Sequence, residues 1–520
     1  MDLAIANGLV VDGTGVPAFK SDVWIDKGRI AKVGRDSSIV AERVIDAEGM
    51  VVAPGFTDIH THSDFCLLWN KQMERKVRQG VTTEVIGNCG VSAAPLTRGA
   101  IADLKAFLKS WVMSFDKLDF SWETQAGYFD VLERGGLGIN VASLVGHTMV
   151  RLNVLGFDNR APSPAELQRM KDLVEQSMRQ GAFGLSTGLD QVAPGNYATT
   201  EEVAELCKVV ARVGGIHASH MRGYPSPDEI IRVAELSGVK SHIAHYGMMD
   251  SQSERKLEGV AKKGTAITLD LYPYTAGMDF FRSYLPESLQ GGDPEEIAKR
   301  IASPEVREAV KKRDPSITWL IRDMIVWKNV MVAYCEKNKS FQGKTIDEIA
   351  NIRQVDPIDA LFDLYIEEKG KAMIITFGAG RTEETIVNAL RHPRSTVGSD
   401  SIEWPVDRHP RSYGTHSRIL GRYVRDTKVL GLEEAVRKMA CLPAQILGIP
   451  DRGCIREGMW ADVVVLDMTE INDKSTYAHP EAYATGVREV IINGELVLDN
   501  GQMTNILPGK ALRSHASRDN

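Results

Sequence analysis

Hydrophobic residues alternate with polar ones over short stretches at both ends of the chain. Near the N-terminus these stretches are LAIANGLVVDG, SDVWIDKGRIAKVG and RVIDAEGMVVAPG, and near the C-terminus they are ADVVVLDM and REVIINGELVLDNG. Alternation with a period of two, bounded by Gly and Asp-Gly breaks, predicts strands joined in hairpins. The two strand-rich ends therefore predict one small β-sandwich, assembled from residues 1–54 and 449–520.

The middle of the chain follows a different pattern, in which short apolar runs alternate with helical stretches. Helices are predicted, for example, over Pro164–Arg179, Thr200–Val213 and Pro227–Leu236. The predicted strands are Val52–Ile59, Thr82–Ile86, Ile139–Leu144, Phe183–Ser186, Gly215–Ser219, Lys240–Ala244, Ala266–Leu271 and Ser395–Val397. Eight β-then-α units of this kind predict an α/β fold, a (β/α)8 barrel of the TIM type.

The connection between the seventh and eighth predicted strands is too long for a single βα unit. Residues 283–346 within it are charged and helix-prone, and we interpret them as an inserted helical subdomain before the last barrel strand. The barrel itself is then predicted over residues 55–282 and 347–448.

Composition and charge exclude several classes of protein. The 520 residues include 62 Lys and Arg against 69 Asp and Glu, with no basic stripe, so nucleic acid is not an expected partner. No run of about 18 apolar residues is present, so no membrane span is expected. The six cysteines are scattered and the N-terminus lacks the pattern of a signal peptide, which predicts reduced thiols and a cytoplasmic protein. The oligomeric state stays open, a homo-oligomer included.

Six residues that can bind a metal ion lie at the ends of predicted barrel strands. They are His60 and His62 after the first strand, Cys89 after the second, His220 after the fifth, His245 after the sixth and Asp400 after the eighth. Barrel enzymes place their chemistry at this rim, and alternate residues such as the first two can reach one ion. Each residue alone has a common structural explanation, as a core His or Cys or a helix-capping Asp. The set together favours a metal site.

Other candidate residues carry weaker signals. His217 and His242 lie inside strands, so we interpret them as packing residues or as supports for the metal site. For His147, after the third strand, a role in the pocket and a structural role are equally open. Gly184–Gly188 matches the G-x-S-x-G motif of serine hydrolases, but a loop with Pro and Gly follows it where that motif needs a helix.

Around these residues the sequence resembles the amidohydrolase superfamily, and specifically the D-aminoacylases, which are N-acyl-D-amino acid deacylases. The matching stretches cover nearly the whole chain: APGFTDIHTHSD, GVTTEVIGNCGVSAAP, NVASLVGH, GAFGLSTGL, ASHMR, LDLYPYTAG, VGSD, HPRSYGTHSRILGRYVR and RGCIREGMWADVVVLD. The resemblance implies a (β/α)8 barrel beside a small β-sandwich, with a helical insertion before the last strand. It also implies a zinc-dependent hydrolase that acts on C–N bonds other than peptide bonds.

The resemblance further implies which residues bind zinc. A tight site would use Cys89, His220 and His245, and a weaker or partly occupied second site His60, His62 and Asp400. Asp400 would also be the general base, which passes a proton from water to the leaving nitrogen. Arg411 would bind the carboxylate of a small-molecule amide substrate, with Tyr272 assisting.

The sequence departs from the family pattern mainly where substrate is recognised. Relatives usually carry a lysine two residues after the last metal histidine, where this chain has Gly247, and an acidic pair where it has Gly223-Tyr224-Pro225. The carbamylated lysine of many superfamily members is also missing from GLSTGLDQ, and Cys89 in the bridging place is consistent with the D-aminoacylase branch. Arg411 favours an N-acyl-D-amino acid as substrate, whereas Gly247 favours a hydantoin-like cyclic amide. A non-catalytic barrel used for assembly is a third hypothesis, which the retained metal residues disfavour.

Overall fold

Parallel strands close into a barrel at the centre of the computed structural model, which describes residues 1–36, 38–108, 118, 120–190, 193–265, 267–317, 319, 325–378, 380–402 and 408–515. The barrel strands are β6 (Phe56–Asp58), β7 (Val81–Ile86), β8 (Asn140–Ser143) continued by β9 (Val145–Gly146), β10 (Gly184–Gly188), β11 (Ile216–His220), β12 (Lys240–Ile243), β13 (Thr268–Leu271) and β17 (Ser395–Val397). They pair in the order β6-β7-β8 and then β9 through β13 to β17, and a bridge from Thr61 to Ser401 closes the ring. This is the predicted (β/α)8 barrel.

The first predicted strand, Val52–Ile59, is wrong as a single element. It divides into β5 (Val51–Pro54), which pairs with strands of the terminal sheet, and β6, which belongs to the barrel. Gly55 separates the two, and a Cβ at this position would lie 2.2 Å from the Thr82 side chain. Both halves are buried, so the apolar pattern is continuous across Gly55 and does not reveal that one strand ends and another begins. In the seventh predicted strand, Ala266 lies outside the described residues.

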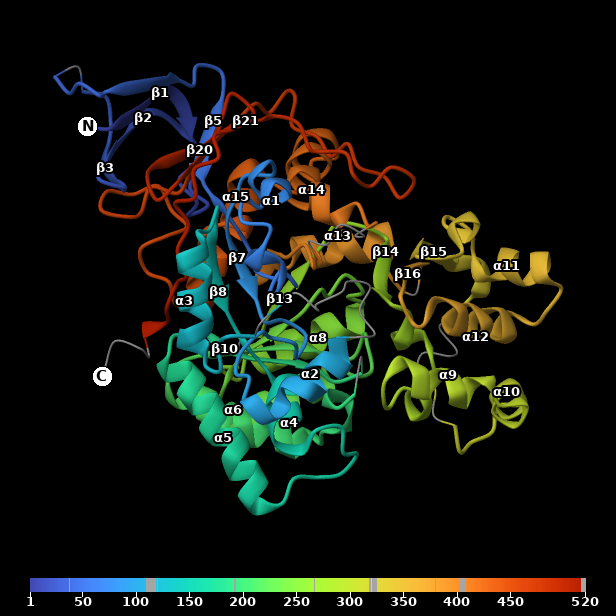
Figure 1. Ribbon diagram of the computed structural model, residues 1–520. Coiled ribbons are helices and arrows are strands. Elements are labelled where there is room, and N and C mark those ends of the chain that lie inside the picture. Colours follow the sequence, from blue (N-terminus) through green and yellow to red (C-terminus); the bar gives the residue numbers. More distant parts are fainter. Residues whose placement is uncertain are drawn as a thin grey trace.

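Helices surround the barrel strands (Figure 1). They are α1 (Glu74–Val77), α2 (Ile101–Leu108), α3 (Gln125–Gly135), α4 (His147–Leu155), α5 (Pro164–Arg179), α6 (Thr200–Arg212), α7 (Asp228–Ser237), α8 (Ser251–Ala261), α13 (Glu383–Arg391), α14 (Arg411–Arg418), α15 (Leu432–Met439) and α16 (Cys441–Leu447). Helix α5 shows why the sequence predicts them well. Ser163 and Glu166 form a capping box at its start, and Met170, Val174 and Met178 form its buried face at helical spacing. No helix in the described part of the chain is long and apolar enough to cross a membrane.

Both ends of the chain meet in one nine-stranded sheet, seen at the upper left of Figure 1. Its strands are β1 (Leu3–Val10), β2 (Phe19–Asp26), β3 (Arg29–Val33), β4 (Arg43–Asp46), β5, β18 (Val463–Leu466), β19 (Val487–Ile492), β20 (Glu495–Asp499) and β21 (Gln502–Met503). The antiparallel pair β5–β18 joins the two halves. Along β18, Val463 and Val465 enter a core of this module, whereas Val464 and Leu466 enter the main core with the barrel. We propose residues 1–54 and 449–520 as its extent.

A helical region lies between β13 and β17, at the right of Figure 1. It contains β14 (Ala276–Phe280), α9 (Pro294–Ala302), α10 (Pro304–Lys311), β15 (Val330–Cys335), α11 (Ile346–Arg353), α12 (Pro357–Glu368) and β16 (Ala372–Phe377). Its separate hydrophobic core draws on residues from Phe281 to Ile374, and β14, β16 and β15 form a small sheet at its base. We therefore propose that the insertion, predicted over 283–346, extends to about residue 377.

A buried ion pair braces the place where the barrel closes. The Lys76 ammonium, on α1, donates to Asp58 Oδ2 at 2.6 Å and to the hydroxyls of Ser399 and Ser401 at 2.8 and 2.5 Å. The carboxylate of Asp58 also accepts from the Ser399 backbone N–H at 2.8 Å. Because Asp58 belongs to β6 and the two serines follow β17, this network ties the first barrel strand to the last.

Replacing Lys76 by methionine should destabilise the protein strongly. The Asp58 carboxylate would be left buried without its cation, which typically costs about 3–5 kcal/mol. Urea unfolding followed by circular dichroism measures the change, and a further Asp58→Leu substitution should restore part of it. Arg98→Met provides the control, because Arg98 forms an exposed ion pair with Glu123 and should leave the midpoint unchanged. A Lys76→Met protein as stable as the wild type would contradict the proposed brace.

Candidate metal centre

The six predicted metal residues come together at the C-terminal rim of the barrel. Cys89 Sγ lies 3.4 Å from His60 Nε2, 3.5 Å from His245 Nε2 and 3.9 Å from His220 Nδ1. Asp400 Oδ1 lies 3.2 Å from His62 Nε2 and 3.6 Å from His60 Nε2. One thiolate, four imidazoles and one carboxylate therefore face a common point.

The donor atoms form two overlapping groups. Within each group all donor atoms lie within 4.8 Å of one another, and the groups are His60, Cys89 and His245, and His60, His62 and Asp400. His60 belongs to both groups. His220 approaches the first group through Nδ1 alone, because its Nε2 lies 2.7 Å from Asp190 Oδ1.

Three of these residues adopt a backbone conformation that is uncommon for side chains with a Cβ. The φ angles of Cys89, His245 and Asp400 are 49°, 38° and 52°, in the left-handed region. Each follows the last residues of a barrel strand, and the turn directs its side chain to the common point rather than along the strand. Such conformations cost about 1–3 kcal/mol each and are concentrated at functional sites.

Asp270, which the sequence analysis missed, supports the centre from inside the barrel. Its Oδ2 lies 3.3 Å from His60 Nδ1 and 2.9 Å from His242 Nε2, and its Oδ1 accepts from the His245 backbone N–H at 2.9 Å. A proton on His60 Nδ1 is thereby held toward Asp270, which leaves Nε2 to face Cys89. The available signal was an acidic residue in the middle of the apolar strand β13.

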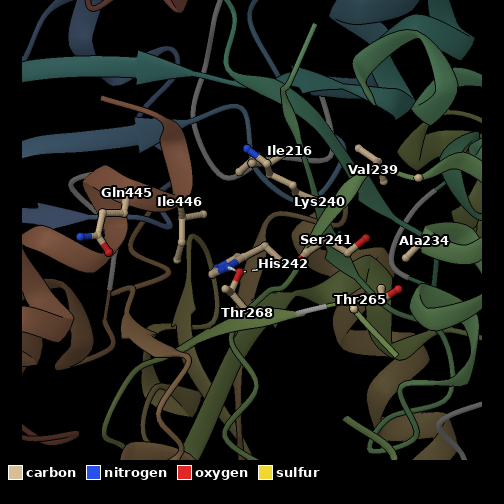
Figure 2. Close-up of a pocket in the computed structure, with 12 residues that line it drawn as sticks. Ile216, Ala234, Val239, Lys240, Ser241, His242, Thr265, Thr268, Gln445 and Ile446 are labelled. Atoms are coloured by element: carbon tan, nitrogen blue, oxygen red, sulfur yellow. Dashed lines mark hydrogen bonds between the residues drawn. The ribbon is translucent and has the colours of Figure 1, made fainter. Parts of the chain in front are cut away.

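His242 connects this support to the opposite end of the barrel. A cavity of about 380 Å³ opens there, lined by the first residues of β11, β12 and β13, by the segments that precede β12 and β13, and by Gln445 and Ile446 of α16. Figure 2 shows the His242 ring in this cavity, with its Nδ1 2.8 Å from the Thr268 hydroxyl. The cavity contains none of the predicted metal residues, and His242 supports Asp270, in agreement with its interpretation as a supporting residue.

The charges of the centre depend on one another. Burial raises the pKa of the Cys89 thiol, but His60 and His245 outweigh burial and hold that pKa well below its usual value. Burial lowers the pKa of His62, but hydrogen bonds to Asp400 and Cys89 raise it to about 9. Against the effect of burial, interaction with the buried anions raises the pKa of His60, His62 and His220, whereas burial and His220 lower the pKa of His245. A divalent cation bound between the same groups would also compensate the buried anions.

A cavity of about 530 Å³ opens beside the metal residues. Its walls include His220, His245 and Asp400 from the centre, and Tyr272 and Arg381 from the loops around it. Of the predicted substrate residues, Tyr272 follows β13, is buried and lines this cavity. Arg411 begins α14 and lines the narrower space next to Cys89, with its Nη1 2.5 Å from Asp400 Oδ2. Two guanidinium groups contact the ring of Tyr272, with the Cζ atoms of Arg411 and Arg381 at 4.8 and 4.3 Å from the ring centre.

The remaining sequence candidates have structural contacts. Ser186 of the G-x-S-x-G match is buried in β10, where its hydroxyl donates to the Gly87 carbonyl and accepts from the Gly90 backbone N–H. It therefore holds the loop that carries Cys89. His147 Nε2 lies 3.0 Å from Glu202 on α6, and His217 Nε2 lies 2.9 Å from the Thr187 hydroxyl. None of these side chains lines the cavity beside the metal residues.

The comparisons with known proteins agree with this geometry. A model of the amidohydrolase family matches residues 43–276 and 325–498. The D-aminoacylase of Alcaligenes xylosoxydans xylosoxydans is 32% identical over 99% of this chain and 98% of its own length. The structure of an N-acyl-D-glutamate deacylase from Bordetella bronchiseptica, complexed with zinc and a phosphonate inhibitor, has a TM-score of 0.81 at 30% identity and covers 99% of this chain and 100% of that chain.

A second solved structure, of a D-aminoacylase with a binuclear metal centre, has a TM-score of 0.80 at 30% identity and covers 98% of this chain and 99% of that chain. The similarity extends over the barrel, the insertion and both ends of the chain. This chain therefore belongs to the amidohydrolase family, in the branch of the D-aminoacylases and N-acyl-D-amino acid deacylases.

Proposed function

We propose that this chain is a zinc-dependent deacylase that hydrolyses N-acyl-D-amino acids to a D-amino acid and a carboxylate. The observation that carries the proposal is the position of Cys89 Sγ within 3.9 Å of three imidazole nitrogens, two of which, from His220 and His245, belong to residues that line a 530 Å³ cavity. A deacylase needs such a polar metal site beside a pocket that can hold an amide. The relatives supply the reaction class, since they are named for the deacylation of N-acyl-D-amino acids.

The donor set fits zinc. Thiolate sulfur, imidazole nitrogen and carboxylate oxygen are the ligands that zinc prefers, and the donor atoms lie within 4.8 Å of one another in each group. We assign the tight site to Cys89, His220 and His245, because Cys89 Sγ lies 3.9 Å from His220 Nδ1 and 3.5 Å from His245 Nε2, although His60 and not His220 belongs to the compact group with Cys89 and His245. We assign a weaker site to the second group, His60, His62 and Asp400. Bound there, zinc would polarise the scissile carbonyl and lower the pKa of a water molecule.

Asp400 is the proposed general base of this reaction. Burial raises its pKa, but Arg411 and His62 hold the pKa well below the usual value of a carboxylic acid. The carboxylate is therefore ionised at neutral pH and can accept a proton from the attacking water. It can then give this proton to the leaving nitrogen, which restores the carboxylate.

Arg411 and Tyr272 are the proposed residues for holding the substrate. Arg411 is buried, and its guanidinium contacts both Asp400 and the ring of Tyr272. The contact of Arg411 with the proposed base links the position of the substrate to the position of Asp400. Gly247 favours the cyclic-amide alternative, because it stands where relatives usually carry a lysine. In the structure the guanidinium of Arg381 fills the space beside Gly247, so a cation is retained there and the deacylase is the better-supported function.

Turnover of three compounds tests the proposed function. We expect the zinc-loaded protein to release D-methionine from N-acetyl-D-methionine and to lose this activity with a chelator. The L-isomer should react about 100-fold more slowly, because the inverted centre displaces the scissile carbonyl by an ångström or more. Hydantoin should not react. Equal rates for the two isomers, or turnover of hydantoin alone, would contradict the proposal.

Two single substitutions separate the proposed base from the proposed tight site. Asp400→Asn should lower kcat by about 10²–10⁴-fold, the usual contribution of a general base, and should retain the tightly bound zinc. Cys89→Ala should lose the tightly bound zinc as well as activity. Zinc per chain after dialysis, measured by mass spectrometry, distinguishes the two outcomes. A Cys89→Ala protein with full zinc and full activity would show that the ligand assignment is wrong.

Asp270→Asn tests the support beneath the metal residues. An amide keeps the shape of the carboxylate but no longer fixes the His60 tautomer by charge, so zinc affinity should fall about 10–100-fold. Competition with a fluorescent chelator measures the affinity. Asp462→Asn is the matched control, because Asp462 is also buried but pairs with Arg452 in the terminal module. Its zinc affinity should equal that of the wild type, and a similar loss in both variants would point to a general folding defect.

A further inference from the structure

The guanidinium of Arg381 lines the cavity proposed for the substrate, and it has not been assigned a role in binding or catalysis. The residue precedes α13, after the insertion, and only 7% of its surface is exposed. Its Nη2 donates to the His245 backbone carbonyl at 2.8 Å, whereas its Nη1 is buried and has no hydrogen-bond partner among the described residues. The side chain is thus fixed in place with part of its bonding capacity unused.

No described carboxylate neutralises Arg381. The other two arginines that line the cavity system have acidic partners, Arg411 with Asp400 at 2.5 Å and Arg222 with Glu229 at 2.9 Å. A buried charge is costly unless it is paired, so natural proteins rarely retain one without a partner. An anionic group of a ligand would supply the partner that the protein does not.

The surroundings of Arg381 hold the guanidinium at the cavity wall. Its Cζ lies 4.3 Å from the centre of the Tyr272 ring, which stacks on Arg411 at 4.8 Å. On its other side, a Cβ added at Gly247 would lie 2.3 Å from Arg381 Nη1. Glycine at 247 is therefore a condition for this position of the guanidinium. Planar guanidinium groups bind carboxylates through paired hydrogen bonds, which suits an amino-acid carboxylate.

Asp279 gives the cavity an opposite charge at another point. It lies on β14, lines both the large cavity and the narrower space next to Cys89, and accepts hydrogen bonds from Ser283 Oγ and the Phe280 N–H. No lysine or arginine among the described residues forms an ion pair with Asp279. Burial raises the pKa of Asp279 to about 6, so its carboxyl is ionised at pH 8. A second carboxylate on the substrate would meet this charge.

We propose that Arg381 is a specificity-determining residue that binds the α-carboxylate of the substrate. Together with Asp279 it selects N-acyl-D-amino acids that carry one negative charge, with neutral rather than acidic side chains. This inference rests on the proposed deacylase function. It adds Arg381 to Arg411 and Tyr272 on the carboxylate side, and it gives Gly247 a positive role as the residue that makes room.

Arg381→Met tests the carboxylate contact. At pH 8 the variant should raise KM for N-acetyl-D-methionine about 10–100-fold, the usual effect of losing a hydrogen bond to a charged group. KM for N-acetyl-D-methioninamide, which lacks the carboxylate, should not change, and neither should zinc content. Arg381→Lys should fall between wild type and Arg381→Met. An equal change for acid and amide would overturn the proposal.

Gly247→Ala tests the same carboxylate contact by displacing the Arg381 guanidinium instead of removing it. The added Cβ should displace the guanidinium, so the loss of preference for the acid over the amide should match that of Arg381→Met. Combining both substitutions should add nothing further, because each removes the same interaction. If both Gly247→Ala and Arg381→Met keep the wild-type preference for the acid over the amide, the proposed role of Arg381 is wrong.

The side-chain preference tests Asp279. Wild type should favour N-acetyl-D-methionine over N-acetyl-D-glutamate by at least about tenfold in kcat/KM, a difference of one screened like-charge contact. Asp279→Asn should narrow this ratio while leaving the acid-to-amide preference intact. Wild-type preference for N-acetyl-D-glutamate would overturn the selection against acidic side chains. No turnover of any N-acyl-D-amino acid would overturn the proposed function and this inference together, whereas D-selective turnover that ignores Arg381 would overturn the inference alone.

Discussion

The candidate site depends on how the barrel closes between its first and last strands. Backbone hydrogen bonds from Asp400 N to His60 O and from His62 N to Ser401 O, both 2.8 Å, set the register of the two strand ends. The buried Lys76 ammonium makes that register costly to change, because a shift would leave it and Asp58 unpaired. Two of the imidazoles stand on one strand end and the carboxylate on the other. Their distances therefore follow from the closure and not from contacts among themselves.

A second constraint is the neutralisation of charge inside the rim. Asp270 bonds to two imidazoles and to the His245 backbone, Asp190 bonds to His220, and Arg411 bonds to Asp400. His60, His220 and Asp400 thus each have a partner behind the side chain that fixes its orientation, and the backbone of His245 is held as well. Preorganisation of this kind lets a metal ion bind without first reorganising the side chains.

The rim residues could be predicted from sequence because parallel strands of a barrel all end at one rim, whatever the detailed packing. The partners behind them could not, because nothing in LDLYPY or GLSTGLDQ says which imidazole an acidic residue will face. The break at Gly55 was hidden for a different reason: both β5 and β6 are buried, so the apolar pattern is continuous. Arg381 lies 136 residues from His245, whose carbonyl it contacts, and only the folded chain brings the two together.

The candidate metal residues and the residues proposed to recognise the substrate come from different parts of the fold. The six candidate metal residues belong to strand ends of the barrel, whereas Asp279 and Arg381 lie where the insertion leaves and rejoins it, on β14 and after β16. A change in the insertion can then alter the charge around the proposed substrate site without replacing any of the candidate metal residues. At Gly247 the sequence alone suggests a lost cation, yet the structure places a guanidinium in the same space from a distant segment. Substrate recognition in this branch therefore has to be compared by position in space, since the residue that supplies a charge need not occupy the same place in the chain.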